Sequence, residues 1–131
     1  MAFLENAGRY TPSLVRYAVG IVFLLIGIMQ FSSPESWIGY LAEGFSIPFG
    51  ISLTQAMTGI GAFNALVGLL LIIGLITRIA AALAVLHLIG VIASIGYNDI
   101  SIRDFGLLLA ALSVFLNGTD SLCLEKAWKR Q

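Results

Sequence analysis

Four long apolar stretches dominate this sequence of 131 residues and constrain its fold more than any other feature. A membrane-spanning α-helix needs about 20 mostly apolar residues. Three of the stretches reach that length, and the fourth approaches it only when polar residues at its ends are counted. The sequence therefore predicts an all-α fold, a four-transmembrane-helix bundle that forms a single domain. The expected spans cover about residues 14–31, 56–76, 79–97 and 101–117.

The composition supports a lipid environment and excludes several classes of function. Of the residues, 59% are hydrophobic and 11% are charged, whereas an ordinary soluble domain has about 25% charged residues. The lipid bilayer is therefore the first expected partner. The seven basic and seven acidic residues cancel, so the chain has no positive field for binding nucleic acid.

The distribution of basic residues predicts the orientation of the spans. Only Thr77 and Arg78 separate the second and third stretches, so the chain should reverse direction around Gly74 to Arg78. With four spans, Arg103 alone among the basic residues lies on the outer side. Both termini, including a tail over residues 118–131, should then be cytoplasmic. The basic residues on the inner side are Arg9, Arg16, Arg78, Lys126, Lys129 and Arg130.

The longest connection, residues 32–55, is expected on the outer side as an interfacial helix or a re-entrant segment. Ser33 can cap a helix that has Pro34 at its first position. Trp37 and its apolar neighbours would form the face that lies in the interface, and Gly44 would end the helix. The alternative is an aromatic belt that only anchors the bundle.

Each expected span carries small or polar residues at helical spacing, which predict the faces where the helices touch. Small residues allow helix backbones to approach closely in lipid. Arg16 lies in the first turn of its span and is expected to extend to the headgroups. The stripes are Arg16, Gly20, Gly27 and Gln30; Thr54, Gly61, Asn64 and Gly68; Ala80, Ala84, His87, Gly90 and Ser94; and Arg103, Gly106, Ala110, Ser113 and Asn117.

His87 and Asn64 are the candidate binding residues, because they are polar groups near the middle of apolar spans. Polar groups at this depth should face the bundle interior. One interpretation is a cleft in which they hydrogen-bond the carbonyl of a quinone. The other is that they bond each other or a backbone carbonyl and only fix the helix register.

A second group of charged residues is expected at the outer mouth of the bundle. Arg103 can pair with Asp99 about one helical turn away, and Asp104 can bind the free amides at the helix start. Arg103 and Asp104 could thus form a mouth or dock a partner, or they could simply cap a short helix. Glu125, in the tail, is expected to be solvated.

No metal site and no catalytic residue can be assigned from the sequence. One histidine and one cysteine fall short of any metal-ligand spacing, and the single Cys123 cannot form a thiol pair. Haem ligation by His87 would require a second ligand from another chain. The protein is therefore expected not to catalyse a reaction on its own, and quinone is the one cofactor considered.

The sequence resembles the DoxX family of small four-helix membrane proteins from about Leu14 to Leu124. The shared residues are Arg16-x3-Gly20-x2-Phe23-x3-Gly27-x2-Gln30-Phe31, then Asn64-x3-Gly68-Leu69-Leu70-Leu71-x2-Gly74-Leu75-x-Thr77-Arg78, and Arg103-Asp104-x-Gly106-Leu107-Leu108. The resemblance implies an inner-membrane protein. Some relatives act as the membrane subunit of a thiosulfate:quinone oxidoreductase. Where members often carry glutamate and lysine, this chain has Asn64 and Gln30.

Three functions follow as hypotheses. The first is a small membrane subunit of an oxidoreductase or respiratory-type complex, associated with quinone and with other subunits. The second is a purely structural subunit of a larger membrane complex. The third, a small-solute transporter, is disfavoured because no carboxylate lies at mid-depth in the expected spans.

Overall fold

The computed structural model describes residues 1–41 and 46–131, and within these ranges the chain is helical without strands. The all-α prediction is confirmed. The elements in chain order are α1 (Ala2–Gly8), α2 (Thr11–Ser32), the 3-10 helix η1 (Pro34–Tyr40), α3 (Leu53–Ile73), α4 (Thr77–Ile95), α5 (Asp99–Asn117) and α6 (Leu124–Trp128).

Three helices of the described chain, α2, α3 and α4, are long and apolar enough to cross a membrane. Large apolar side chains remain exposed on each of them, as Leu25, Leu66 and Leu86 illustrate. This outward apolar surface suits lipid rather than water. The helix α5 also has 19 residues, but it carries Asp99, Arg103 and Asp104 in its first two turns.

The long helices begin two or three residues before the expected spans, and polar residues cap the first turns of α3 and α5. Ser52 and Gln55 form a reciprocal capping box at the start of α3, and the Asn98 side chain accepts from the Ser101 amide at the start of α5. The predicted reversal is the three-residue turn between α3 and α4. Gly74 ends α3 with φ 71°, a left-handed conformation that favours glycine.

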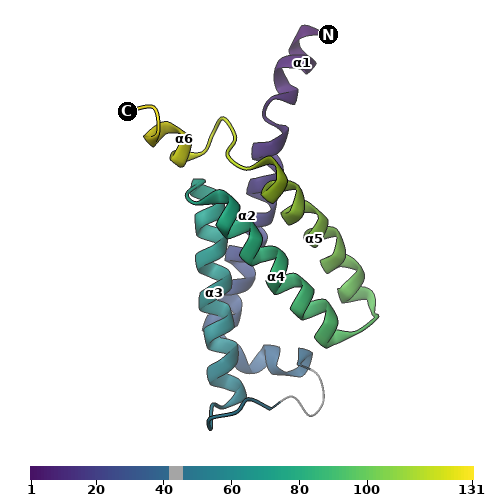
Figure 1. Cartoon of the computed structure of the whole chain (residues 1–131). Helices are drawn as coiled ribbons and strands as arrows, with labels where there is room; N and C mark the ends of the chain where they lie inside the picture. Colours follow the sequence, from purple (N-terminus) through teal and green to yellow (C-terminus); the bar gives the residue numbers. More distant parts are fainter. Residues whose placement is uncertain (42–45) are drawn as a thin grey trace.

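The helices form two antiparallel pairs, α2 with α3 and α4 with α5 (Figure 1). Both chain termini lie at the end of the bundle that holds the α3–α4 turn, and η1 lies at the opposite end (Figure 1). In the first pair, a Cβ atom on Gly27 or Gly68 would overlap the backbone of Ala65 or Leu24. The predicted small-residue stripes of α2 and α3 therefore lie where these two helices approach each other closely.

Most of the stripe predicted for α5 is not its contact face, although Ala110 packs against the core. Gly106, Ser113 and Asn117 are exposed, whereas Ala111 and Val114 are buried in the core. The small residues of this contact come from α4, where Ala80, Ala81 and Ala84 are fully buried. Small side chains are needed on only one of two facing helices, so α5 supplies the larger ones.

The segment after α2 differs from the helix expected there. Up to residue 41 it contains the short 3-10 helix η1, and Ser33 precedes this helix without a side-chain capping bond. The Ser33 hydroxyl is thus not the predicted cap, because its backbone, at φ −139° and ψ 62°, enters a 3-10 rather than an α-helical turn. Gly44, the expected end of the helix, lies outside the described residues.

Candidate functional site

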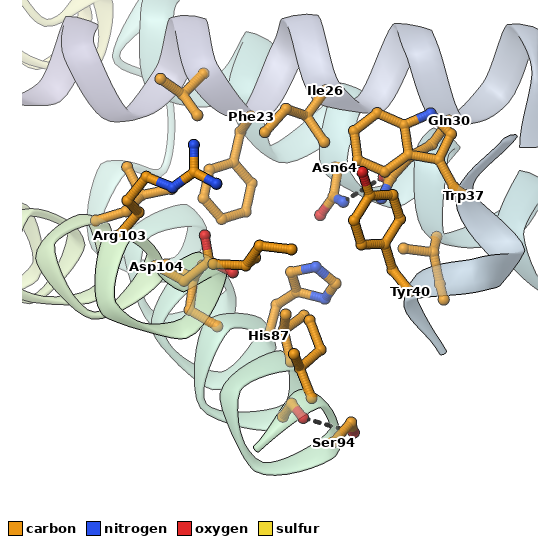
Figure 2. Close-up of a pocket in the computed structure, with 18 of the residues that line it drawn as sticks. Phe23, Ile26, Gln30, Trp37, Tyr40, Asn64, His87, Ser94, Arg103 and Asp104 are labelled. Atoms are coloured by element: carbon orange, nitrogen blue, oxygen red, sulfur yellow. Dashed lines mark hydrogen bonds between the residues drawn. The ribbon is translucent and has the colours of Figure 1, made fainter. Parts of the chain in front are cut away.

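A cavity of about 970 Å³ lies between the two helix pairs (Figure 2). Its walls come from α2, η1, α3, α4 and α5. The four residues singled out from the sequence, Asn64, His87, Arg103 and Asp104, all line it. Residues from three helices, up to 40 positions apart in the chain, are thereby brought around one space.

The cavity exists because the two helix pairs pack closely at one end only. On α4 the buried residues run from Thr77 to Leu88, and the residues beyond, such as Gly90 and Ser94, are exposed or line the cavity. Alanines at the closely packed end allow the pairs to touch. His87 lines the cavity next to Leu88, the last buried residue of α4.

Asn64 is fixed on the cavity wall by Gln30. Its Nδ2 donates to Gln30 Oε1 at 2.8 Å, and the two side chains are 3% and 8% exposed. Within residues 1–41 and 46–131, the buried Asn64 Oδ1 has no hydrogen-bond partner. Figure 2 shows this oxygen pointing toward the cavity. The bond ties α3 to α2, as a register contact would, but it does not involve His87.

His87 projects into the cavity between two aromatic rings. Its ring centroid lies 6.1 Å from that of Phe23 and 5.5 Å from that of Phe63. No hydrogen bond to either imidazole nitrogen is formed by the residues that the structure describes. The imidazole ring therefore packs against apolar aromatic rings, and its nitrogen atoms are available to hydrogen-bond a small molecule in the cavity.

Two aromatic residues of η1, Trp37 and Tyr40, also line the cavity, with ring centroids 5.5 Å apart. The sequence predicted Trp37 at a membrane interface but did not predict it on the wall of this cavity. From the sequence alone, an aromatic residue near the end of a span can belong either to an anchoring belt or to the wall of a cavity. Only the path of η1 beneath the helix pairs makes the distinction (Figure 1).

The charged group at the start of α5 is only partly as predicted. Arg103 Nη2 lies 3.7 Å from Asp99 Oδ2, which confirms the predicted pairing, and both side chains are exposed. Asp104 does not bind the free amides of the helix start, because α5 begins five residues earlier and Asn98 caps it. Asp104 instead lies half-buried beside the cavity, with Arg103 next to it (Figure 2).

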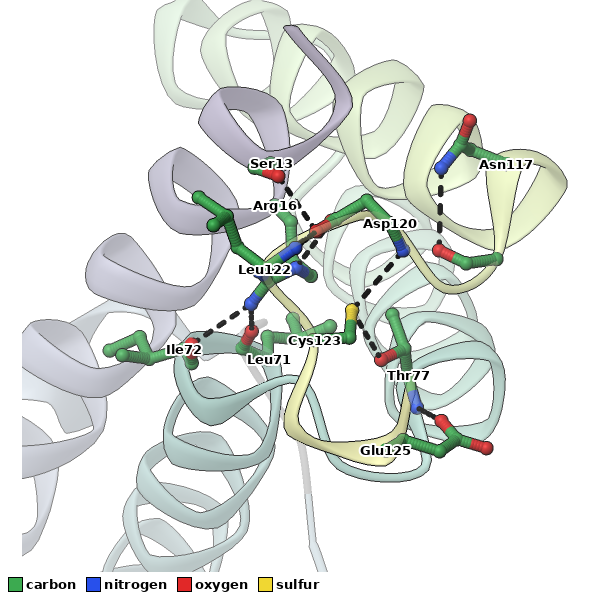
Figure 3. A network of polar contacts seen from close by, with 11 residues as sticks. Ser13, Arg16, Leu71, Ile72, Thr77, Asn117, Asp120, Leu122, Cys123 and Glu125 are labelled. Atoms are coloured by element: carbon green, nitrogen blue, oxygen red, sulfur yellow. Dashed lines mark hydrogen bonds and ion pairs between the residues drawn. The ribbon is translucent and has the colours of Figure 1, made fainter. Parts of the chain in front are cut away.

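A second polar cluster, which the sequence did not predict, lies at the end of the bundle with the termini (Figure 3). Arg16 is 0% exposed, and its Nε donates to Asp120 Oδ2 at 2.7 Å. Its Nη1 donates to the backbone carbonyls of Leu71 and Ile72. The expectation that Arg16 extends to headgroups is wrong, because α3 ends beside it and offers free carbonyls while Asp120 supplies a countercharge.

Asp120 accepts from three sources in this cluster. Besides Arg16, the Ser13 hydroxyl donates to Oδ1 at 2.7 Å and the Leu122 amide donates to the same oxygen at 2.9 Å. Burial alone would raise the pKa of Asp120, but these hydrogen bonds and the charge of Arg16 lower it from 3.8 to about 2. Asp120 is thus a stable carboxylate that holds the chain after α5 against α2.

The residues after Asp120 continue this attachment to the α3–α4 turn. Cys123 is buried, with its Sγ 3.5 Å from Thr77 Oγ1. The Glu125 amide donates to Gly74 O at 3.1 Å, and its carboxylate accepts from the Thr77 amide at 3.3 Å. Glu125 is therefore not simply solvated as expected, because it binds a free amide at the start of α4.

The apolar helices of this chain match a family of known proteins. The family model described as DoxX matches residues 11–96 of the chain. This chain belongs to the DoxX family. The matched part of the DoxX protein contains Arg16, Asn64 and His87, whereas Arg103 and Asp104 lie beyond it. No curated protein and no solved structure matches the chain.

Proposed function

We propose that this DoxX protein is a small integral membrane subunit of an oxidoreductase complex and that its cavity binds the head group of a quinone. The observation that carries the proposal is the cavity itself, in which Asn64 and His87 present polar atoms from the middle of two apolar helices. Apolar pockets with a few converging polar groups are the usual form of small-molecule sites.

The walls of the cavity suit a flat ring with polar atoms at its edge. Phe23, Trp37 and Tyr40 offer apolar and aromatic surface, against which a planar ring packs favourably. The imidazole of His87 can hydrogen-bond an oxygen of that ring. A volume of about 970 Å³ also leaves room for part of an apolar tail.

The proposed placement in the membrane gives such a ligand access. We infer that α5 is a fourth span, because its 19 residues extend about 28 Å, close to the hydrocarbon thickness of about 30 Å. Four crossings put both termini on one side, and the basic residues there make that side cytoplasmic. In the inner membrane, the space between the helix pairs would then lie within the lipid that dissolves quinones.

The redox group of the proposed complex belongs to another subunit. Among the described residues, the polar side-chain groups that line the cavity are those of Gln30, Asn64, His87, Ser94, Arg103 and Asp104, the hydroxyl of Tyr40 and the indole N–H of Trp37, and none of these transfers an electron pair in ordinary enzyme chemistry. The exposed pair of Arg103 and Asp99 offers charged groups for docking such a subunit. The role of this chain is to hold and orient the quinone.

Tryptophan fluorescence provides the test. Trp37 lines the cavity and Trp128 does not, so a Trp128→Phe background leaves one reporter at the site. Titration of a short-tailed benzoquinone into this protein in native-lipid nanodiscs should quench Trp37 saturably. His87→Ala should weaken binding about fivefold, since a lost hydrogen bond is worth roughly 1 kcal/mol.

The matched control is Leu83→Ala, one turn away on the same helix and outside the cavity lining. It should bind like the parent protein. Quenching that never saturates, or equal affinities for the parent and His87→Ala, would contradict the proposal.

A purely structural role remains the second candidate, favoured by one contact. The Asn64–Gln30 hydrogen bond links α2 and α3 and needs no ligand to explain it. Native electrophoresis after mild extraction separates the two candidates when combined with the titration. A structural subunit would migrate in a large complex and yet show no saturable quenching.

A further inference from the structure

The hydrogen bond between Gln30 and Asn64 determines which atom Asn64 presents to the cavity. Because Nδ2 donates to Gln30 Oε1, the amide group is oriented and Oδ1 is left as an acceptor. That oxygen is buried and has no partner within the described residues. In Figure 2 it faces the space between Asp104 and His87. A buried polar atom without a partner is costly, so a ligand that donates a hydrogen bond there is favoured.

The two redox forms of a quinone differ in this respect. The oxidised form has two carbonyl oxygens, which accept hydrogen bonds and donate none. The reduced form, the quinol, has two hydroxyl groups, and each can donate one. Only the reduced form can therefore supply the donor that Asn64 Oδ1 lacks.

We infer that the cavity binds the quinol in preference to the quinone, with one ring hydroxyl donating to Asn64 Oδ1. This inference rests on the proposed function and adds the redox form of the ligand to it. No bond is made or broken in the binding event, and the reducing equivalents already reside in the quinol.

His87 does not provide this preference. A neutral imidazole has one nitrogen that donates and one that accepts, so it can bond either a carbonyl oxygen or a hydroxyl group. Its ring is positioned by Phe23 and Phe63 and not by a hydrogen bond to the described chain. The Asn64 oxygen that lacks a partner in the described chain thus favours the quinol, whereas His87 contributes to the binding of both forms.

Preferential binding of the quinol has a consequence for the redox couple. A site that binds the reduced form more tightly raises the midpoint potential of the bound couple. For a two-electron couple, each tenfold preference corresponds to about 30 mV. The bound quinone is then a stronger oxidant than quinone in the lipid, which favours its reduction by electrons from a partner subunit.

The test compares both forms with the same protein. Anaerobic calorimetry of the full chain in nanodiscs measures the affinity of a short-tailed benzoquinone and of its quinol. The quinol should bind about fivefold more tightly, the usual effect of one satisfied hydrogen bond. Asn64→Leu should lose this difference, because leucine offers no acceptor to the quinol hydroxyl group.

A second variant guards against misfolding of the first. Gln30→Met removes the partner that orients the Asn64 amide, so the amide can rotate and present either group. The quinol preference should shrink while both forms still bind. Thermal unfolding of each variant, alongside the off-cavity control Leu83→Ala, verifies that the bundle is folded.

The outcomes separate this inference from the proposed function. Equal affinities, or tighter binding of the quinone, would overturn the inference and leave quinone binding intact. An unchanged quinol preference in folded Asn64→Leu would also overturn it. If neither form binds to the parent protein, the proposed function fails, and the inference fails with it.

Discussion

Replacing Asp120 by asparagine should destabilise the protein far more than replacing an exposed carboxylate. Arg16 is 0% exposed and has Asp120 as its acidic partner at 2.7 Å. Asp120→Asn leaves the guanidinium buried without a countercharge. The new amide would also turn an NH2 group toward donors, because both Asp120 oxygens accept hydrogen bonds in the native protein.

The magnitude follows from two considerations. The pKa of about 2 for Asp120, against 3.8, converts to about 2 kcal/mol of stabilisation of the charged form. Removing one partner of a buried ion pair costs about 3–5 kcal/mol. The value of about 2 kcal/mol describes protonation of the aspartate, whereas Asp120→Asn also turns an NH2 group toward hydrogen-bond donors. We therefore expect a loss of about 3 kcal/mol in the free energy of unfolding.

Reversible unfolding in mixed detergent micelles measures the effect, with Asp99→Asn as the matched control. Asp99 pairs with Arg103, and their side chains are 86% and 74% exposed, so the control should lose less than about 1 kcal/mol. The double variant Arg16→Met, Asp120→Leu should recover most of the stability, because it removes both charges together. A loss for Asp120→Asn no larger than that of Asp99→Asn would refute the reasoning.

Three further predictions follow from the same structure. Because the pKa of Asp120 is lower in the folded state, its contribution should be complete above about pH 4 and lost as pH falls toward 2; acid titration of stability should show this slope in the parent and not in Asp120→Asn. Gly68→Ala should cost about 1–3 kcal/mol by overlap with the α2 backbone, whereas Gly59→Ala, with open space around it, should be close to neutral in the same unfolding assay. In a Cys123→Ala background, Tyr97→Cys should react with an impermeant maleimide in intact cells and Gln131→Cys should not, and labelling at both positions would contradict an even number of spans.

The helical fold and part of the cavity could be predicted from local sequence. Long apolar runs require helices in lipid, and Gly74 marks the reversal between α3 and α4. Asn64 and His87 could be expected to face inward because polar groups near the middle of apolar helices avoid lipid. Whether both residues line one cavity depends on which helices pack together. The spacing of polar residues within each helix indicated the faces that would meet.

The Arg16–Asp120 pair could not be predicted in the same way. An arginine in the first turn of an apolar helix is equally compatible with snorkelling to headgroups. Its burial depends on the chain after α5 crossing back over the start of α2, a contact between residues 104 positions apart. The contact face of α5 was missed for a related reason, since Ala80 and Ala84 of α4 already provide the small residues for that interface.

The separation of Arg16 and Asp120 along the chain also affects how the protein is made. During translation Arg16 enters the membrane region long before its acidic partner has been synthesised. Until Asp120 is made, it cannot neutralise Arg16 in the nascent bundle. The start of α2 is therefore favoured at the aqueous boundary over the interior of the bundle. Final closure of this end therefore awaits the synthesis of the segment that follows α5, and a product cut short before Asp120 would expose the defect to cellular quality control.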